Sequence, residues 1–304
     1  MTRVIVVPGE GPEAPETVEA AARAAARRGL PLEALAAPRL PPETGRLAAR
    51  AGVPEREILG LLEADARERL RALAPEAQTV VRLGEHPFVE IVRRAIETGA
   101  ALVVKAAEGA PSRLFASLDQ HLLRKCPCPV WLRRGSGAEG PRRLLAAVDV
   151  APGPEEAEEA ALDARIVRAA AELAEDGATL LLVHVWEAAG AGLVRLWSET
   201  GDAAAAATAY VEDVRGAHAE ALERVAERAR EAAAGRLEVR VDLRRGEPRE
   251  AIPAVARAFG ADLVALGTIG RRGAPGLIIG NTAEDVLNAV EVSVLAVKPA
   301  GWRS

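Results

Sequence analysis

The sequence contains one pattern twice, and this duplication limits the fold more than any other feature. Gly84-Glu85-His86-Pro87 precedes a helical pattern and then the apolar run 99–104. Gly246-Glu247-Pro248 precedes a second helical pattern and the apolar run 260–266. A chain of 304 residues is long enough for one or two domains. The repeat therefore predicts two related domains in tandem.

Each copy alternates short apolar runs with longer amphipathic segments. In the first copy we expect strands near 3–7, 32–36, 78–83, 101–105 and 129–133, and helices near 15–28, 55–73, 86–98 and 112–124. In the second copy we expect strands near 143–149, 179–186, 237–243, 262–266 and 292–297, and helices near 155–175, 203–234, 247–258 and 282–289. Strands that alternate with helices form parallel sheets covered on both faces. The pattern predicts an α/β protein with two flavodoxin-like, doubly wound, five-stranded parallel sheets.

A joint rich in glycine separates the two copies. Residues 135–141 read Gly-Ser-Gly-Ala-Glu-Gly-Pro, which is typical of a linker. We predict a first domain at 1–134, a linker at 135–141 and a second domain at 142–304.

Charge and hydropathy disfavour several classes of protein. The net charge of −5 does not favour a protein that coats nucleic acid, so we expect no nucleic-acid partner. The first apolar run is too short for a signal peptide, and no window reaches the roughly 18 apolar residues of a membrane span. We expect a cytoplasmic protein with no membrane partner.

The most specific functional pattern follows the fourth expected strand of the second copy. The apolar run 263–266 leads into a turn with five glycines, Gly267, Gly270, Gly273, Gly276 and Gly280. Asn281-Thr282-Ala283-Glu284 then has the composition of a helix start. Glycines let a backbone approach a phosphate, and the first N–H groups of a helix attract negative charge. The pattern predicts a phosphate site, with an ordinary surface loop before a capped helix as the alternative.

Neither common phosphate motif is present. The dinucleotide motif needs G-x-G-x-x-G, whereas two residues separate Gly267 from Gly270. The P-loop needs lysine after glycine, and none of the three lysines follows a glycine.

The spacing resembles a different signature. Gly267, two residues, Gly270, nine residues and then Gly280 with a small polar residue is similar to the nucleotide-binding signature of the universal stress protein family. The segment 280–284 (Gly-Asn-Thr-Ala-Glu) and the segment 121–131 (His-Leu-Leu-Arg-Lys-Cys-Pro-Cys-Pro-Val-Trp) resemble its tandem, E-type members. The resemblance covers essentially the whole chain. The family signature usually ends in Gly-Ser or Gly-Thr, whereas this chain has Gly280-Asn281. The amide of asparagine needs more room beside a phosphate than a hydroxyl does.

The resemblance implies a nucleotide site in the second copy, with ATP or AMP as ligand. Asp149 would face the adenosine end, Val185 would line the base, and Leu266 and Gly267 would flank the ribose. The phosphates would be lined by Gly270, Gly280, Asn281 and Thr282, with positive charge added by Arg271.

The first copy has largely lost this pattern. Ala106 stands where the second copy has Gly267, and no glycine matches Gly280. The first strand ends Val7-Pro8-Gly9, so it has no counterpart of Asp149. We predict that the first copy does not bind nucleotide.

Candidates for catalysis and metal binding are few. The four histidines share no short spacing typical of a metal site or a triad, and His184 lies in an apolar run where we expect a satisfied core residue. Cys126 and Cys128 lack the second cysteine pair of a tetrahedral zinc site, so we recognise no metal site. We interpret both cysteines as small buried hydrophobes.

These patterns lead to one main hypothesis and two alternatives. The main hypothesis is a non-catalytic sensor or regulator that binds an adenine nucleotide or another phosphate-bearing ligand in its second copy. The alternatives are an interaction or scaffold protein with an empty or repurposed pocket, and a slow ATPase. The resemblance also implies that the last strands of the two copies pair, giving an intramolecular pseudo-dimer with pseudo-two-fold symmetry. A further homodimer stays open.

Overall fold

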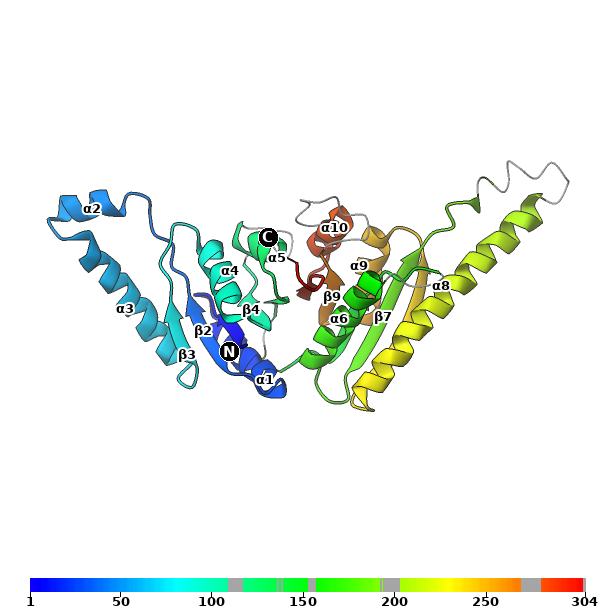
Figure 1. Cartoon of the computed structure of the whole chain (residues 1–304), viewed down its shortest axis with the longest axis horizontal. Helices are drawn as coiled ribbons and strands as arrows, with labels where there is room; N and C mark the ends of the chain where they lie inside the picture. The colour runs from blue at the N-terminus through cyan, green and yellow to red at the C-terminus, as the bar shows by residue number, and fades with distance from the viewer. Residues whose placement is uncertain are drawn as a thin grey trace. The chain divides into compact units, whose positions relative to one another are not determined.

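The computed structural model describes residues 1–108, 117–135, 137, 139–152, 157–191, 193, 203–268 and 280–302. The chain divides into two compact units (Figure 1). The first consists of Met1–Gly140 with Glu291–Ser304, and the second of Pro141–Val290. The last strand of the second sequence copy therefore groups with the first unit.

The first unit is built on a sheet in the order β3-β2-β1-β4-β5-β10. The strands are β1 (Val4–Val7), β2 (Leu32–Ala36), β3 (Gln78–Val81), β4 (Leu102–Ala106), β5 (Val130–Arg133) and β10 (Ser293–Val297). β1 to β5 are parallel. β1, β4, β5 and β10 are buried along their whole length, which agrees with their mostly apolar sequences.

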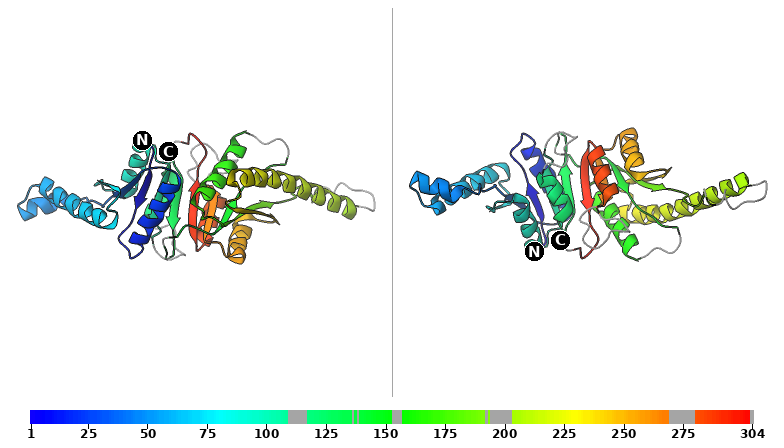
Figure 2. Two further views of the ribbon diagram at one scale, coloured as in Figure 1. Left: turned by 90° about the horizontal axis from the view of Figure 1, so that it is seen from below. Right: turned by 90° about the horizontal axis from the view of Figure 1, so that it is seen from above.

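Helices cover both faces of this sheet (Figure 2). They are α1 (Ala14–Arg27), α2 (Thr44–Ala51), α3 (Glu55–Leu73), α4 (Pro87–Thr98) and α5 (Ser117–Lys125). α1 and α3 contact each other on one face, and α4 and α5 contact each other. Right-handed crossovers require this division, because the chain reverses its direction across the sheet after β3.

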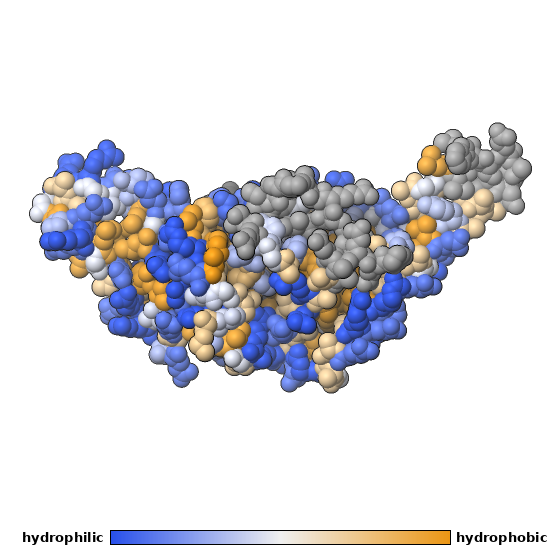
Figure 3. All heavy atoms as spheres, viewed as in Figure 1, coloured by the Kyte–Doolittle hydropathy of each residue, from blue (hydrophilic) through white to orange (hydrophobic). Residues whose placement is uncertain are grey.

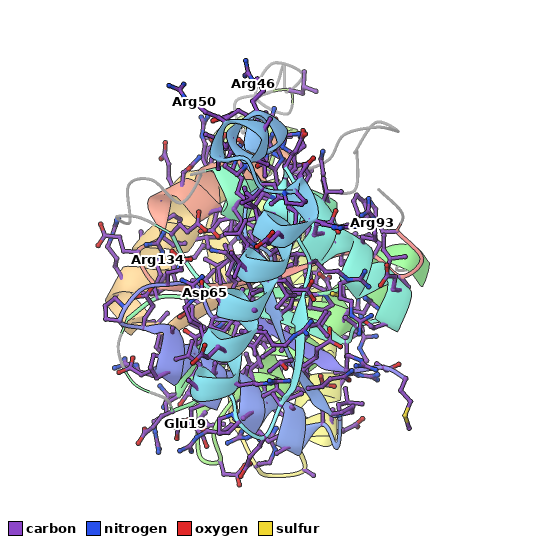
Figure 4. The ribbon with its side chains drawn as sticks, turned by 90° about the vertical axis from the view of Figure 1, so that its left-hand side faces the viewer. Glu19, Arg46, Arg50, Asp65, Arg93 and Arg134 are labelled. Atoms are coloured by element: carbon purple, nitrogen blue, oxygen red, sulfur yellow. The ribbon has the colours of Figure 1, made fainter. Side chains whose placement is uncertain are left out.

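α2 is a helix that the sequence pattern did not predict. It has eight residues, includes Gly45, and ends at Gly52, whose φ of 71° is left-handed. Arg46 and Arg50 project away from it (Figure 4). Leu47 is exposed, and Figure 3 shows further hydrophobic residues at the surface around α3. A helix of eight residues makes barely two turns, which is too short for its periodicity to be recognised in the sequence.

The second unit holds four described parallel strands in the order β9-β6-β7-β8. They are β6 (Arg143–Ala147), β7 (Thr179–Trp186), β8 (Glu238–Arg245) and β9 (Leu263–Gly267). The helices are α6 (Ala157–Leu173), α8 (Ala203–Ala233), α9 (Pro248–Phe259) and α10 (Asn281–Ala289). α6 packs with α8, and α9 packs with α10, as two pairs.

The doubly wound α/β class is confirmed, and the structure adds the strand order. In each unit the first strand lies inside the sheet, and the chain first proceeds to one side and then crosses to the other. The order of the first five strands is 3-2-1-4-5, whereas flavodoxin itself has 2-1-3-4-5. The alternation of strands and helices is the same for both orders, so the sequence does not separate them. The topological switch point, where the strand order reverses, therefore lies between β1 and β4 in the first unit and between β6 and β9 in the second.

The last strands of the two copies pair with each other inside the first unit. β10 is antiparallel to β5, and Leu295 lies opposite Trp131. Both strands are fully buried, so the pairing covers an apolar edge that would otherwise invite aggregation. The pseudo-dimer and its symmetry remain predictions.

A buried lysine follows β10 directly. Lys298 is 1% exposed, and its Nζ donates to the Leu123 carbonyl oxygen at 2.6 Å. Its ammonium also lies 4.9 Å from the centre of the Trp302 ring. Burial lowers the pKa of Lys298 from 10.5 to about 8, with negative charge on Cys126 and Cys128 opposing the shift.

Replacing Lys298 by methionine should stabilise the protein at pH 7 by on the order of 2 kcal/mol, because the cost of burying an ammonium disappears. Between pH 8 and 10.5 the folded state releases the Lys298 proton before the unfolded state does. The unfolded state then binds more protons, so wild-type stability rises with pH in this window. Urea unfolding at pH 7, 8, 9 and 10 should show the gap between Lys298→Met and wild type closing. Lys125→Met is the control, and equal pH slopes for Lys298→Met and wild type would contradict the burial argument.

Candidate functional site

Three strand ends of the second unit meet at its switch point. Ala147 pairs with Leu266 on one side and with Val183 on the other. Asp149 follows β6 by two residues, and Val185 lies near the end of β7. Asp149 is exposed, Val185 is half-buried and Leu266 is buried. The structure thus brings the residues assigned to the base and ribose to one edge of the sheet.

The backbone of the turn after β6 is held by α6. The Asp149 N–H donates to Asp163 Oδ1 at 3.1 Å, and Asp163 is buried. The sequence analysis did not single out Asp163, although a carboxylate one helical turn from the apolar residues Ile166 and Val167 indicates a buried position. Its hydrogen bond fixes where the exposed Asp149 stands.

Gly267 has a packing role that the sequence did not reveal. A Cβ on Gly267 would lie 3.1 Å from Leu162 Cδ2 and 3.5 Å from Ile166 Cδ1, both on α6. The absence of a side chain therefore lets α6 lie close to the end of β9. The ribose contact implied by the resemblance stays a prediction.

The two ends of the glycine-rich turn are joined by a backbone hydrogen bond. The Gly280 N–H donates to the Thr268 carbonyl oxygen at 2.8 Å. The amide that the resemblance assigns to the phosphates is thus engaged by the protein itself. Gly270 and Arg271, also assigned there, lie outside the residues that the structure describes.

The first turn of α10 presents backbone donors. Glu284 N–H makes the first intrahelical bond, to the Gly280 carbonyl oxygen, so the amides of Asn281, Thr282 and Ala283 precede it. Gly280 caps the helix without a side-chain hydrogen bond. Asn281 and Thr282 are exposed, so a ligand can reach this turn.

Thr268 is a second residue that the sequence analysis missed. It is 0% exposed, and its Oγ1 has no hydrogen-bond partner among the described residues. A buried hydroxyl without a hydrogen-bond partner lowers the stability of the folded state. Its position directly after Gly267 was the available signal.

In the first unit, a buried ion pair stands at the corresponding place. Lys105 (2% exposed) donates from Nζ to Asp119 Oδ1 at 2.8 Å, and Asp119 is 0% exposed. The backbone N–H of Glu108 donates to Asp119 Oδ2 at 2.7 Å. Burial raises the pKa of Asp119, and Lys105 opposes that rise. Asp119 thus accepts hydrogen bonds from the Lys105 ammonium and the Glu108 backbone amide, which are donors that an anionic ligand would also use.

Replacing Asp119 by leucine should destabilise the protein by about 1.5–3 kcal/mol, because the buried Lys105 ammonium keeps only the partly exposed carboxylate of Glu108, at 2.9 Å. The double variant Lys105→Met/Asp119→Leu should recover most of that loss, since both charges are gone. Chemical denaturation measures both. Arg215→Ala breaks an exposed pair with Glu212 and should cost under about 1 kcal/mol. A double variant as unstable as the single one would contradict the charge argument.

The histidine expected in the core is buried and hydrogen-bonded, as predicted. His184 is 2% exposed, with Nδ1 3.1 Å from the Val148 carbonyl oxygen. Its Nε2 lies 2.9 Å from His218 Nδ1, on α8. The sequence separation of the two rings concealed this pair.

No group of three or more His, Cys, Asp or Glu side chains in the described residues could hold a metal ion. No helix in the same part of the chain is long and apolar enough to cross a membrane.

Fold and site together define a tandem, doubly wound α/β protein with a glycine-rich turn at one switch point. The sequence model of the universal stress protein family matches residues 1–134 and 141–298. The chain therefore belongs to the universal stress protein family.

Similar proteins agree with this assignment. Universal stress protein E of Escherichia coli strain K12 is 31% identical over 262 residues, covering 85% of this chain and 79% of that one. Universal stress protein E of Salmonella typhi is 30% identical over 263 residues, with 85% and 79% covered. A functionally unknown Pseudomonas aeruginosa protein has the same fold, with a TM-score of 0.62 at 21% identity and 98% and 93% covered.

Proposed function

We propose that the second unit binds an adenine nucleotide or another phosphate-bearing ligand, and that the protein acts as a non-catalytic sensor or regulator. The observation that carries this proposal is the meeting of Asp149, Val185 and Gly267 at the carboxyl ends of the neighbouring strands β6, β7 and β9, beside the switch point. Doubly wound sheets bind ligands outside the carboxyl ends of their strands at this point.

Each part of the ligand has a matching group in this proposal. The Asp149 carboxylate accepts hydrogen bonds from hydroxyl or amino groups of the nucleoside. Val185 gives the base an apolar contact. The amides of Asn281, Thr282 and Ala283 donate to the phosphates, helped by the positive end of the helix dipole. ATP or AMP suits all three contacts.

A repurposed pocket is the second candidate, and a specific observation favours it. The Gly280 amide is bonded to Thr268 rather than open to a ligand. Asn281 also replaces the usual serine or threonine of the family signature. A protein of this kind would act through its surface as an interaction or scaffold protein.

We also propose that the first unit does not bind nucleotide, because Asp119 already supplies an anion at its switch point. The proposal also includes a cytoplasmic location, two domains at 1–134 and 142–304, and a linker at 135–141. The segments matched by the family support those boundaries.

Thr282→Glu is the sharpest variant for testing the phosphate contact. A carboxylate in the first turn of α10 is favourable to the helix, so folding is retained. The same charge repels a phosphate, and we expect ATP affinity to fall at least about tenfold. Thr282→Gln is the matched neutral control and should bind within about twofold of wild type. Isothermal titration calorimetry measures both.

Asp149→Asn tests the other end of the ligand. It should weaken AMP binding by about tenfold and leave inorganic pyrophosphate binding unchanged, because only the nucleoside contacts Asp149.

Mass spectrometry of small molecules released on denaturing the purified protein gives the native ligand. No binding at millimolar nucleotide, with nothing released, would favour the repurposed pocket. Turnover abolished by one of these variants would favour a slow ATPase.

A further inference from the structure

The two cysteines face each other in the core of the first unit. Cys126 follows α5, Cys128 precedes β5, and their Sγ atoms lie 3.5 Å apart. They are 0% and 7% exposed. Pro127 between them has a restricted φ, which limits how far the two side chains can separate. The sequence predicted buried cysteines, but not that their sulfurs would be in contact.

The second sequence copy shows what a purely apolar role requires at these places. α5 and α10 have nine residues each, and the amide after each helix bonds back to the carbonyl four residues earlier, Cys126 to Leu122 and Val290 to Val286. Cys126 therefore corresponds to Val290, and Cys128 to Val292. Valine serves at both positions in the second copy, so packing alone does not call for two thiols.

A cation is buried near the thiols. Lys298 donates to the carbonyl of Leu123, three residues before Cys126, and its charge interacts with both sulfurs. The hydrogen bond between the two thiols, with help from Lys298, lowers the pKa of the Cys126 thiol. The same hydrogen bond and burial raise the pKa of the Cys128 thiol. The pair is therefore polarised, with Cys126 as the better nucleophile.

We propose that Cys126 and Cys128 form a dithiol that small peroxides oxidise to a disulfide, with Cys126 as the attacking sulfur, Cys128 as the resolving sulfur and Lys298 as a positioning residue. The site takes hydrogen peroxide or a compact organic hydroperoxide, because a larger oxidant does not reach buried sulfurs. This modification site is independent of the nucleotide proposal.

The oxidation balances with the peroxide as the two-electron oxidant. The Cys126 thiolate attacks one peroxide oxygen, the O–O bond breaks, and the other oxygen leaves as water after taking a proton. This leaves a sulfenic acid on Cys126. Cys128 sulfur then attacks the Cys126 sulfur, the S–O bond breaks, and the hydroxyl leaves as water with the Cys128 proton. With hydrogen peroxide, two thiols and one peroxide give one disulfide and two waters; with an organic hydroperoxide, the first leaving group is the alcohol in place of one water. The sulfurs must close from 3.5 Å to about 2.05 Å, which side-chain rotation supplies.

Treating the full-length protein with a small excess of hydrogen peroxide tests this proposal. Intact-mass spectrometry should show a loss of about 2 mass units, and thiol titration should show two thiols lost, both restored by dithiothreitol. Cys128→Ser should trap the sulfenic acid on Cys126 as a dimedone adduct. Cys126→Ser should give no such adduct. Circular dichroism checks that each variant is folded.

Two outcomes would overturn the proposal. One is a native protein that keeps both thiols in excess peroxide, which would return the cysteines to a packing role. The other is equal dimedone labelling of Cys126→Ser and Cys128→Ser, which would remove the assigned roles.

Lys298→Met should slow alkylation of Cys126 at pH 7 by about tenfold, while Lys125→Met leaves it unchanged. Equal rates for these two lysine variants would overturn the positioning role of Lys298.

Discussion

Parallel pairing of the strands decides where either copy of this protein can hold a ligand. In a parallel sheet all carboxyl ends lie at one edge, and the reversal of strand order opens a gap there. The register places Ala147 beside Leu266 in the second unit and Val7 beside Lys105 in the first. Both units therefore present the same location on their sheets.

The two copies have diverged in the charge they keep at this location. The second copy has Leu266 in β9 and Ala283 as the third residue of α10. The first has Lys105 and Asp119 at the same two places, and these form a buried ion pair. A buried pair recovers its desolvation cost only when its geometry is good and further hydrogen bonds are made, as Glu108 N–H provides here. The first copy thus carries a carboxylate of its own at the place where the second copy has Ala283.

Periodicity along the sequence was enough to predict most of the elements. The predicted helix 55–73 coincides with α3, and the predicted strand 179–186 coincides with β7. Both are long for their type of element, 19 residues for the helix and eight for the strand, and such segments carry their structure in their own sequence. α2 was missed because its eight residues make barely two helical turns.

Contacts between distant segments could not be predicted in the same way. Periodicity reports which side of a segment is buried, and it does not report what lies opposite. Lys105 with Asp119, and His184 with His218, are pairs of this kind. The approach of α6 to Gly267 depends on the strand order, which the alternation of elements left open. The candidate site was therefore predictable as a place on the sheet, but not as a set of hydrogen bonds.

The bond between Gly280 and Thr268 bears on the site in two opposite ways. It removes one amide from the donors that a phosphate could use. It also holds the start of α10 against the end of β9. The three amides that follow are then held in position before any ligand arrives, and donors fixed in advance lower the entropy that binding must overcome. The proposed phosphate contact therefore rests on the amides of Asn281, Thr282 and Ala283, and not on that of Gly280.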